Sequence, residues 1–129
     1  MSDRVCTLTN VRMESMLGDL EPLLDRDDLI GYAAGRNTRV IKQTILDYLE
    51  NRDRLVRERG EPVLDESGKE TGQYRISRDD GELDRFIEEL RVYGDIEHEV
   101  RIVSVPASEA VGRLTGRQVE ALGWMLEED

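Results

Sequence analysis

One stretch, residues 27–60, carries the longest helical pattern in the chain and reads DDLIGYAAGRNTRVIKQTILDYLENRDRLVRERG. Apolar and arginine side chains recur in it in steps of four and three, which is the spacing of a helix seam. The seam consists of Ile41, Ile45, Tyr48, Arg52, Leu55 and Arg59, and it is widened by Leu49 and Val56. The pattern predicts one long helix whose stripe needs a partner. We expect its central apolar members to lie in the core: Ile41, Ile45, Tyr48 and Leu55.

Both ends of this helix have recognisable signals. The run from Asp25 to Asp28 supplies cap residues and an acidic first turn, which the positive end of a helix dipole favours. Gly60 followed by Pro62 predicts the stop, because glycine accepts a left-handed conformation and proline cannot continue a helix.

Shorter elements are predicted on either side of the long helix. Val5–Thr9 is β-prone, and the segment from Val11 to Leu24 has helical periodicity that Pro22 interrupts. Between Pro62 and Ser77, two β-prone pieces flank a polar, glycine-bearing tip, which predicts a hairpin or flap.

The last third of the chain predicts a helix, a strand and a final helix. Asp79 can cap a helix that continues to Tyr93, in which Leu83, Phe86, Ile87 and Leu90 form one apolar face. Glu97–Val105 is the strongest strand pattern, and its natural partner is Val5–Thr9 or the segment around Tyr74. Thr115 and Gln118 fit a capping box at the start of the last helix.

Together these elements predict an α+β fold. One long helix packs with two or three shorter helices and with a small, mostly antiparallel sheet. A length of 129 residues favours a single domain over residues 1–129. Within it we expect a helical part (11–60), a hairpin or flap (61–78) and a helix-strand-helix part (79–129).

The composition limits the classes of partner. Twenty-nine acids against 18 bases give a net charge of −11, which disfavours direct binding to nucleic acid or to anionic membranes. All but two of the bases are arginine. An acidic, lysine-poor surface suits a salt-rich, halophilic cytoplasm, but a genome rich in G and C explains the arginines equally well. No apolar run is long enough for a signal peptide or a membrane span.

No catalytic pattern stands out in the sequence. Cys6 and His98 are the only residues of their kinds, and we expect a protonated thiol in a strand and a solvated histidine. The segment around Lys69 lacks the glycine and hydroxyl spacing of a phosphate loop, and the acids nearby do not follow a calcium-loop pattern. We therefore predict no enzyme, no cofactor and no metal site.

The long helix also contains the residues that we predict to contact other chains. Two glycines near its start permit close approach of another helix, and an arginine cluster occupies its end, where cations favour the helix dipole. The arginines alternate with Asp53 and Glu58, so a protein interface or helix stability explains them better than nucleic-acid binding. The predicted interface residues are Gly31, Gly35, Arg52, Arg57 and Arg59.

The order of these elements resembles a family of small proteins of unknown function encoded by tailed phages. The resemblance lies in Leu8-Thr9-Asn10 before a helix, the ending from Arg54 to Gly60, the hairpin closing on Tyr74-Arg75-Ile76, Phe86 and Leu90 four residues apart, the valine-rich strand, and the segment from Thr115 to Leu122. The glycines at 31 and 35 depart from the smoother helix of that family. It has no known active residues to transfer.

The resemblance implies a non-enzymatic protein of a tailed virus, either a structural component of the head or tail or an assembly factor. Such a protein would present the long helix and the sheet edge to viral structural proteins or to copies of itself. It would be found in the virion, or in the host cytoplasm during assembly. The alternative from the composition is a soluble acidic inhibitor of host defence that imitates nucleic acid.

Overall fold

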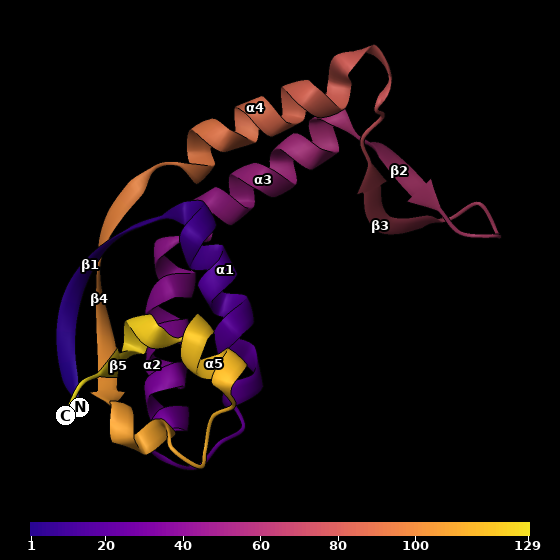
Figure 1. Ribbon diagram of the computed structural model, residues 1–129. Coiled ribbons are helices and arrows are strands. Elements are labelled where there is room, and N and C mark those ends of the chain that lie inside the picture. Colours follow the sequence, from indigo (N-terminus) through magenta and orange to yellow (C-terminus); the bar gives the residue numbers. More distant parts are fainter. The chain divides into compact units, whose positions relative to one another are not determined.

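The computed structural model describes residues 1–129, apart from the side chain of Asp80. The predicted α+β class is confirmed (Figure 1). Residue contacts divide the chain into two compact units, and the boundaries fall at Ile45 and Ile96. Unit 1 comprises Met1–Ile45 and Glu97–Asp129, and unit 2 comprises Leu46–Ile96. The single-domain organisation stays a prediction.

The predicted long helix is present as two consecutive helices, α2 (Leu29–Thr44) and α3 (Leu46–Arg59). Ile45 leaves helical geometry with a ψ of 9°, although its amide still donates to Ile41. One residue earlier, the Thr44 hydroxyl donates to the carbonyl of Val40 at 2.8 Å, a back-bond that competes with the helical ladder. The expected core members Ile41, Ile45, Tyr48 and Leu55 are all buried.

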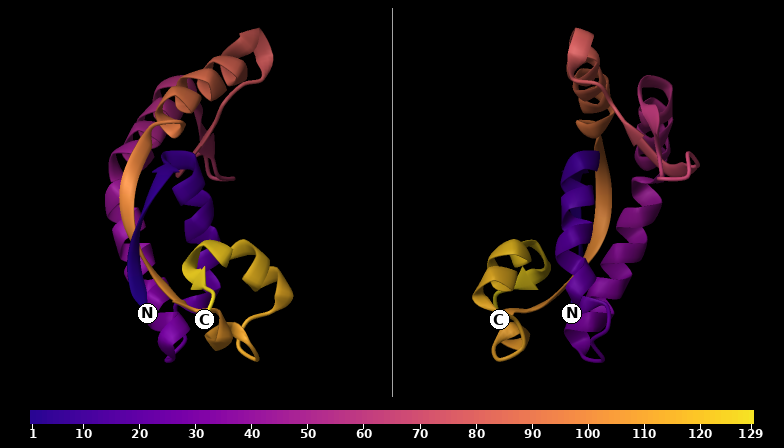
Figure 2. Two further views of the ribbon diagram at one scale, coloured as in Figure 1. Left: turned by 60° about the vertical axis from the view of Figure 1, so that its left-hand side comes forward. Right: turned by 90° about the vertical axis from the view of Figure 1, so that its right-hand side faces the viewer.

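Unit 1 contains a three-stranded sheet in the order β1-β4-β5. Strands β1 (Ser2–Thr9) and β4 (Glu97–Pro106) run side by side and antiparallel (Figures 1 and 2), which confirms the first of the two predicted partners and not the Tyr74 segment. Their ladder is regular, from Ser2 opposite Ser104 to Thr9 opposite Glu97. The short β5 (Leu126–Glu127) pairs with β4 in parallel at Val105.

The core of unit 1 lies where helix α2 packs on β4 and helix α1 (Asn10–Leu20) packs on α2. A 3-10 turn, Glu21–Leu23, ends α1 at Pro22, as the sequence predicted. Small and aliphatic residues of α2 allow the close packing, and the side chains of this core are almost completely buried: Met13, Met16, Leu20, Ile30, Ala33, Ala34, Ile41, Ile102, Val105, Leu122 and Met125.

Asn37 is a buried polar residue in this core, on the strand-facing side of α2. Its Nδ2 donates to the carbonyl of Val103 at 2.9 Å, and its Oδ1 accepts from the Val103 amide at 2.7 Å. One amide side chain therefore satisfies both backbone groups of Val103, as a neighbouring strand would.

The C-terminal segment begins as predicted and then differs. Thr115 and Gln118 form the reciprocal capping box of α5 (Gly116–Ala121). The helix is shorter than expected, because a 3-10 turn, Gly123–Met125, and β5 follow it. On β5, the Glu127 carboxylate accepts from Ser104 at 2.5 Å and from Ser2, so it connects all three strands. These hydroxyls lower the pKa of Glu127.

Unit 2 contains α3, α4 (Glu82–Gly94) and the predicted hairpin, formed by β2 (Glu61–Leu64) and β3 (Glu70–Arg75). Two predicted details are wrong. Asp79 does not cap α4, because a 3-10 turn over Asp79–Gly81 precedes the helix and Gly81, with a φ of 72°, is its N-cap. Gly60 ends α3 without a left-handed φ; a Cβ there would lie 2.6 Å from the carbonyl oxygen of Val56.

None of the helices in the described part of the chain combines the length and the apolar character needed to cross a membrane.

Candidate protein interface

Helix α4 carries the widest partly uncovered apolar stripe in unit 2. Its predicted apolar face, Leu83, Phe86, Ile87 and Leu90, is present, but none of these four residues is fully buried. Ile87 is 44% exposed. Val92 is 69% exposed, but it lies five residues further on and therefore on the opposite, charged side of the helix. Among the described side chains of unit 2, those of Tyr48 and Leu55 on α3 are the buried ones. Helix α3 is thus too narrow to cover the stripe.

Charged side chains border this stripe on the outer side of α4. Asp84, Arg85, Glu88 and Arg91 are exposed, and Arg85 forms an ion pair with Glu82 at 2.9 Å within the helix. An apolar centre with a charged rim is the usual composition of a protein–protein interface. We call Leu83, Ile87 and Leu90, with these charged neighbours, the α4 face.

Arg59, predicted to contact another chain, is used within unit 2. Its guanidinium pairs with the Glu89 carboxylate, to which Nε donates at 3.2 Å, and with Glu82 at 3.4 Å. The Glu89 hydrogen bond raises the pKa of Arg59. The ion pairs join the C-terminal end of α3 to α4, so they hold the α4 face in place rather than belong to it.

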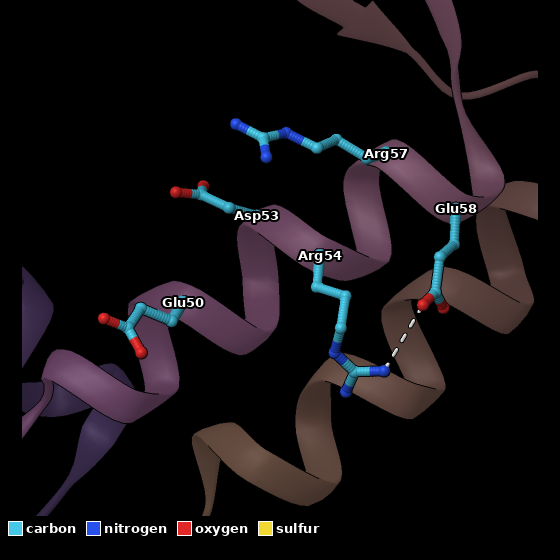
Figure 3. Close-up of a pocket in the computed structure, with 5 residues that line it drawn as sticks. All are labelled: Glu50, Asp53, Arg54, Arg57 and Glu58. Atoms are coloured by element: carbon cyan, nitrogen blue, oxygen red, sulfur yellow. Dashed lines mark hydrogen bonds and ion pairs between the residues drawn. The ribbon is translucent and has the colours of Figure 1, made fainter.

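The other two predicted arginines lie elsewhere on α3. The Arg52 guanidinium lies 6.0 Å from the centre of the Tyr48 ring, a cation–π contact. Arg57 is exposed and borders two shallow depressions. One depression is formed by charged residues of α3 alone, and Figure 3 shows Arg57, Asp53 and Glu50 projecting on the side away from Arg54, which pairs with Glu58 at 3.4 Å.

This charged depression does not have the form of a nucleic-acid mimic or a ligand pocket. Two arginines lie among its three carboxylates, so negative charge is not concentrated there. Its walls come from a single helix, and the lining side chains reach into solvent (Figure 3). It suits the charged rim of an interface better than an enclosed binding site.

The predicted glycines, Gly31 and Gly35, are in different environments. Gly31 is buried, and a Cβ there would lie 2.1 Å from the backbone oxygen of Arg26. Its small size thus serves the turn in which Asp28 caps α2, accepting from the Gly31 amide at 3.1 Å. Gly35 is exposed, and nothing lies within 4 Å of an added Cβ. The structure leaves Gly35 accessible and gives Gly31 a role within the chain.

Asp28 is the centre of a polar cluster that the sequence indicated only as a cap. Arg26 donates to its carboxylate through Nε at 3.1 Å and Nη2 at 2.5 Å, and it also reaches the carbonyl of Arg113 at 3.1 Å. The Arg26 hydrogen bond is the main reason that the pKa of Asp28 falls to about 2. The cluster fixes the start of α2 to the loop before α5.

The lone cysteine and histidine do not form a nucleophile–base pair. Leu8 is the residue opposite His98 in the ladder, and Cys6 is opposite Val100. The expectation of a solvated histidine is wrong, because His98 is half-buried and its Nε2 lies 3.1 Å from Oδ1 of the buried Asn10. The side chains that the structure describes include no group of three histidines, cysteines or acids arranged to hold a metal ion.

Comparison of this chain with protein-family models, curated proteins and solved structures found no match.

Proposed function

We propose that the chain is a non-enzymatic protein of a tailed virus that acts through protein–protein contacts. It is either built into the head or tail of the virion or assists assembly. The observation that carries this proposal is the α4 face, an apolar stripe that α3 leaves partly uncovered within a small unit. The sequence resemblance to small tailed-phage proteins supports the viral setting.

The mechanism follows from burial. Covering Ile87 and the uncovered parts of Leu83 and Leu90 removes apolar surface from water, at roughly 25 cal/mol per Å². The alternating charges of the rim then select the partner, because like charges brought together across an interface are unfavourable. Arg59 holds α4 against α3 through its ion pairs with Glu82 and Glu89, so the stripe is presented by a defined helix pair.

The direct test is mass spectrometry of purified virus particles, combined with a variant of the α4 face. Ile87→Arg places a charge in the stripe at a position already 44% exposed, so the chain should fold normally but be lost from the particles or from its partner. Val111→Arg, at a position 80% exposed in unit 1, is the matched control and should leave incorporation unchanged.

The proposal fails if the chain is absent from particles and light scattering shows a monomer over a wide salt range. It also fails if Ile87→Arg is incorporated, or pulls down viral structural proteins, as well as the unaltered chain does.

A further inference from the structure

Strand β1 has a neighbour on one side only. It stands at the end of the strand order β1-β4-β5, and its eight residues are in regular register with β4. An edge strand exposes a row of unpaired amides and carbonyls, which can pair with another strand.

The contacts of β4 show which backbone groups of β1 face outward. The side chain of Asn37 is hydrogen-bonded to both the amide and the carbonyl of Val103, and β5 pairs with β4 at Val105. The backbone groups of Val103 and Val105 therefore point away from β1. In an antiparallel ladder such residues alternate with those that bond the partner strand. Val103 lies opposite Asp3. The backbone amides and carbonyls of every second residue of β1 therefore point to the free edge, and these residues are Asp3, Val5 and Thr7.

This edge lacks most of the features with which proteins usually prevent edge pairing. Proline, lysine, bulges and a short length are such features, and β1 has none of them; its charged side chains are Asp3 and Arg4, of opposite sign and next to each other. The hairpin of unit 2 differs, because β2 contains Pro62 and a register shift, and β3 contains Gly72 with a φ of 83°. In the middle of β1, Val5 exposes 56% of its surface.

We infer that β1 pairs antiparallel with β1 of a second copy, about a two-fold axis at Val5. Val5 then lies opposite Val5 of the second copy, and Asp3 lies opposite Thr7. Every outward amide and carbonyl of Asp3, Val5 and Thr7 gains a partner, and the two exposed valines cover each other.

Two further observations favour this register. Pairing that brings odd-numbered residues opposite odd-numbered ones keeps the buried faces of both sheets on the same side, whereas a shift of one residue would reverse one of them. The strand ends at Thr9, whose side chain caps α1 by accepting from the amide of Arg12, so the axis lies nearer the middle of the strand. No like charges face each other directly, because Asp3 meets Thr7 and Arg4 meets Cys6.

The inference concerns unit 1 and a second copy of the chain, and it does not rest on the proposed function. A dimer in solution is measured on the pure protein, whereas the proposed function is measured in particles. The dimer and the proposed function can therefore each be refuted while the other stands.

Light scattering or sedimentation of the full chain tests the pairing. We expect a dimer for the unaltered chain and a monomer for Val5→Lys, which places two ammonium groups side by side at the axis. Val111→Lys makes the same change at a site 80% exposed in unit 1 and should leave the dimer intact. Circular dichroism checks that both variants are folded. A monomer for the unaltered chain at all concentrations, or a dimer that survives Val5→Lys, would overturn the inference.

Cysteine cross-linking tests the register in a Cys6→Ser background. Val5→Cys should form a disulfide between copies on oxidation, because paired residues at the axis have Cα atoms about 5.5 Å apart. Thr7→Cys should not, because Thr7 is four residues away from its own counterpart. Cross-linking of Thr7→Cys but not of Val5→Cys would overturn the register.

Discussion

Helix α2 of unit 1 and helix α4 of unit 2 are both amphipathic, but they bury different shares of their apolar residues. Ile30, Ala33, Ala34 and Ile41 of α2 are completely buried, because the helix packs on both α1 and β4. The apolar residues of α4 are half-buried or exposed, because in unit 2 it packs mainly on α3. A helical pattern therefore predicts which face is apolar, and the number of packing elements determines how far that face is buried.

The largest test of this difference compares two isoleucines. Ile41→Ala should lower the free energy of unfolding by about 3 kcal/mol, since it leaves a cavity in a completely buried site. Ile87→Ala on α4 should cost less than about 1 kcal/mol, because that side chain is already half in water. Urea unfolding followed by circular dichroism measures both, and equal losses would contradict the contrast.

A second test removes the buried amide of unit 1. Asn37→Ala should cost about 2 kcal/mol, because it leaves the amide and carbonyl of Val103 without partners in a buried site. In unit 2, Asn51 accepts a hydrogen bond from Arg54 at 3.2 Å on the exposed side of α3, so Asn51→Ala is the control. It should cost no more than about 0.5 kcal/mol. An unchanged urea midpoint for Asn37→Ala would show that water replaces the lost bonds.

A third test uses pH and the ion pair at the start of α2. The pKa of Asp28 is lowered to about 2, so its charged form stabilises the fold above the unfolded value of 3.8, and this contribution is lost as the pH falls through about 2. Asp28→Asn keeps a good helix cap but removes the charge. The variant should be less stable than the unaltered chain at pH 7, and the difference should shrink on acidification. If the stability difference between Asp28→Asn and the unaltered chain does not change with pH, the ionisation of Asp28 does not stabilise the fold.

The smallest expected effect is at Gly35, one of the two predicted interface glycines in α2. Gly35→Ala should stabilise the isolated chain by up to about 1 kcal/mol, because the added methyl meets open space and alanine favours a helix. Gly31→Ala should destabilise it, because its Cβ would overlap the backbone of Arg26. Thermal unfolding of the two variants gives the sign of each change. A loss of stability at Gly35 would mean that another part of the molecule approaches it.

Local signals predicted much of the fold. The caps at Asp28 and Thr115, the break at Pro22 and the hairpin each depend on residues close in sequence, and the structure contains all of them. The interruption at Ile45 had no such signal, because it coincides with a side-chain back-bond at Thr44 that any threonine in a helix can make or omit.

The site was less predictable because its contacts join distant parts of the chain. Asn37 and Val103 are 66 residues apart, and Asn10 and His98 are 88 apart, so both pairs depend on strand register. Gly31 indicated a close approach correctly, but the approaching group is the chain's own Arg26. The alternation of Arg59 with acids on α3 gave no sign that its partners lie on α4.

The amide of Asn37 has a consequence for how far the molecule can assemble. It occupies Val103 beside the two residues of β5, so the part of β4 from Val103 to Pro106 is closed on the side opposite β1. A copy that pairs through β1 uses that edge completely, because the contact closes on itself about the two-fold axis. The buried Asn37 side chain thus shortens the edge of β4 at which a further strand could add to the sheet.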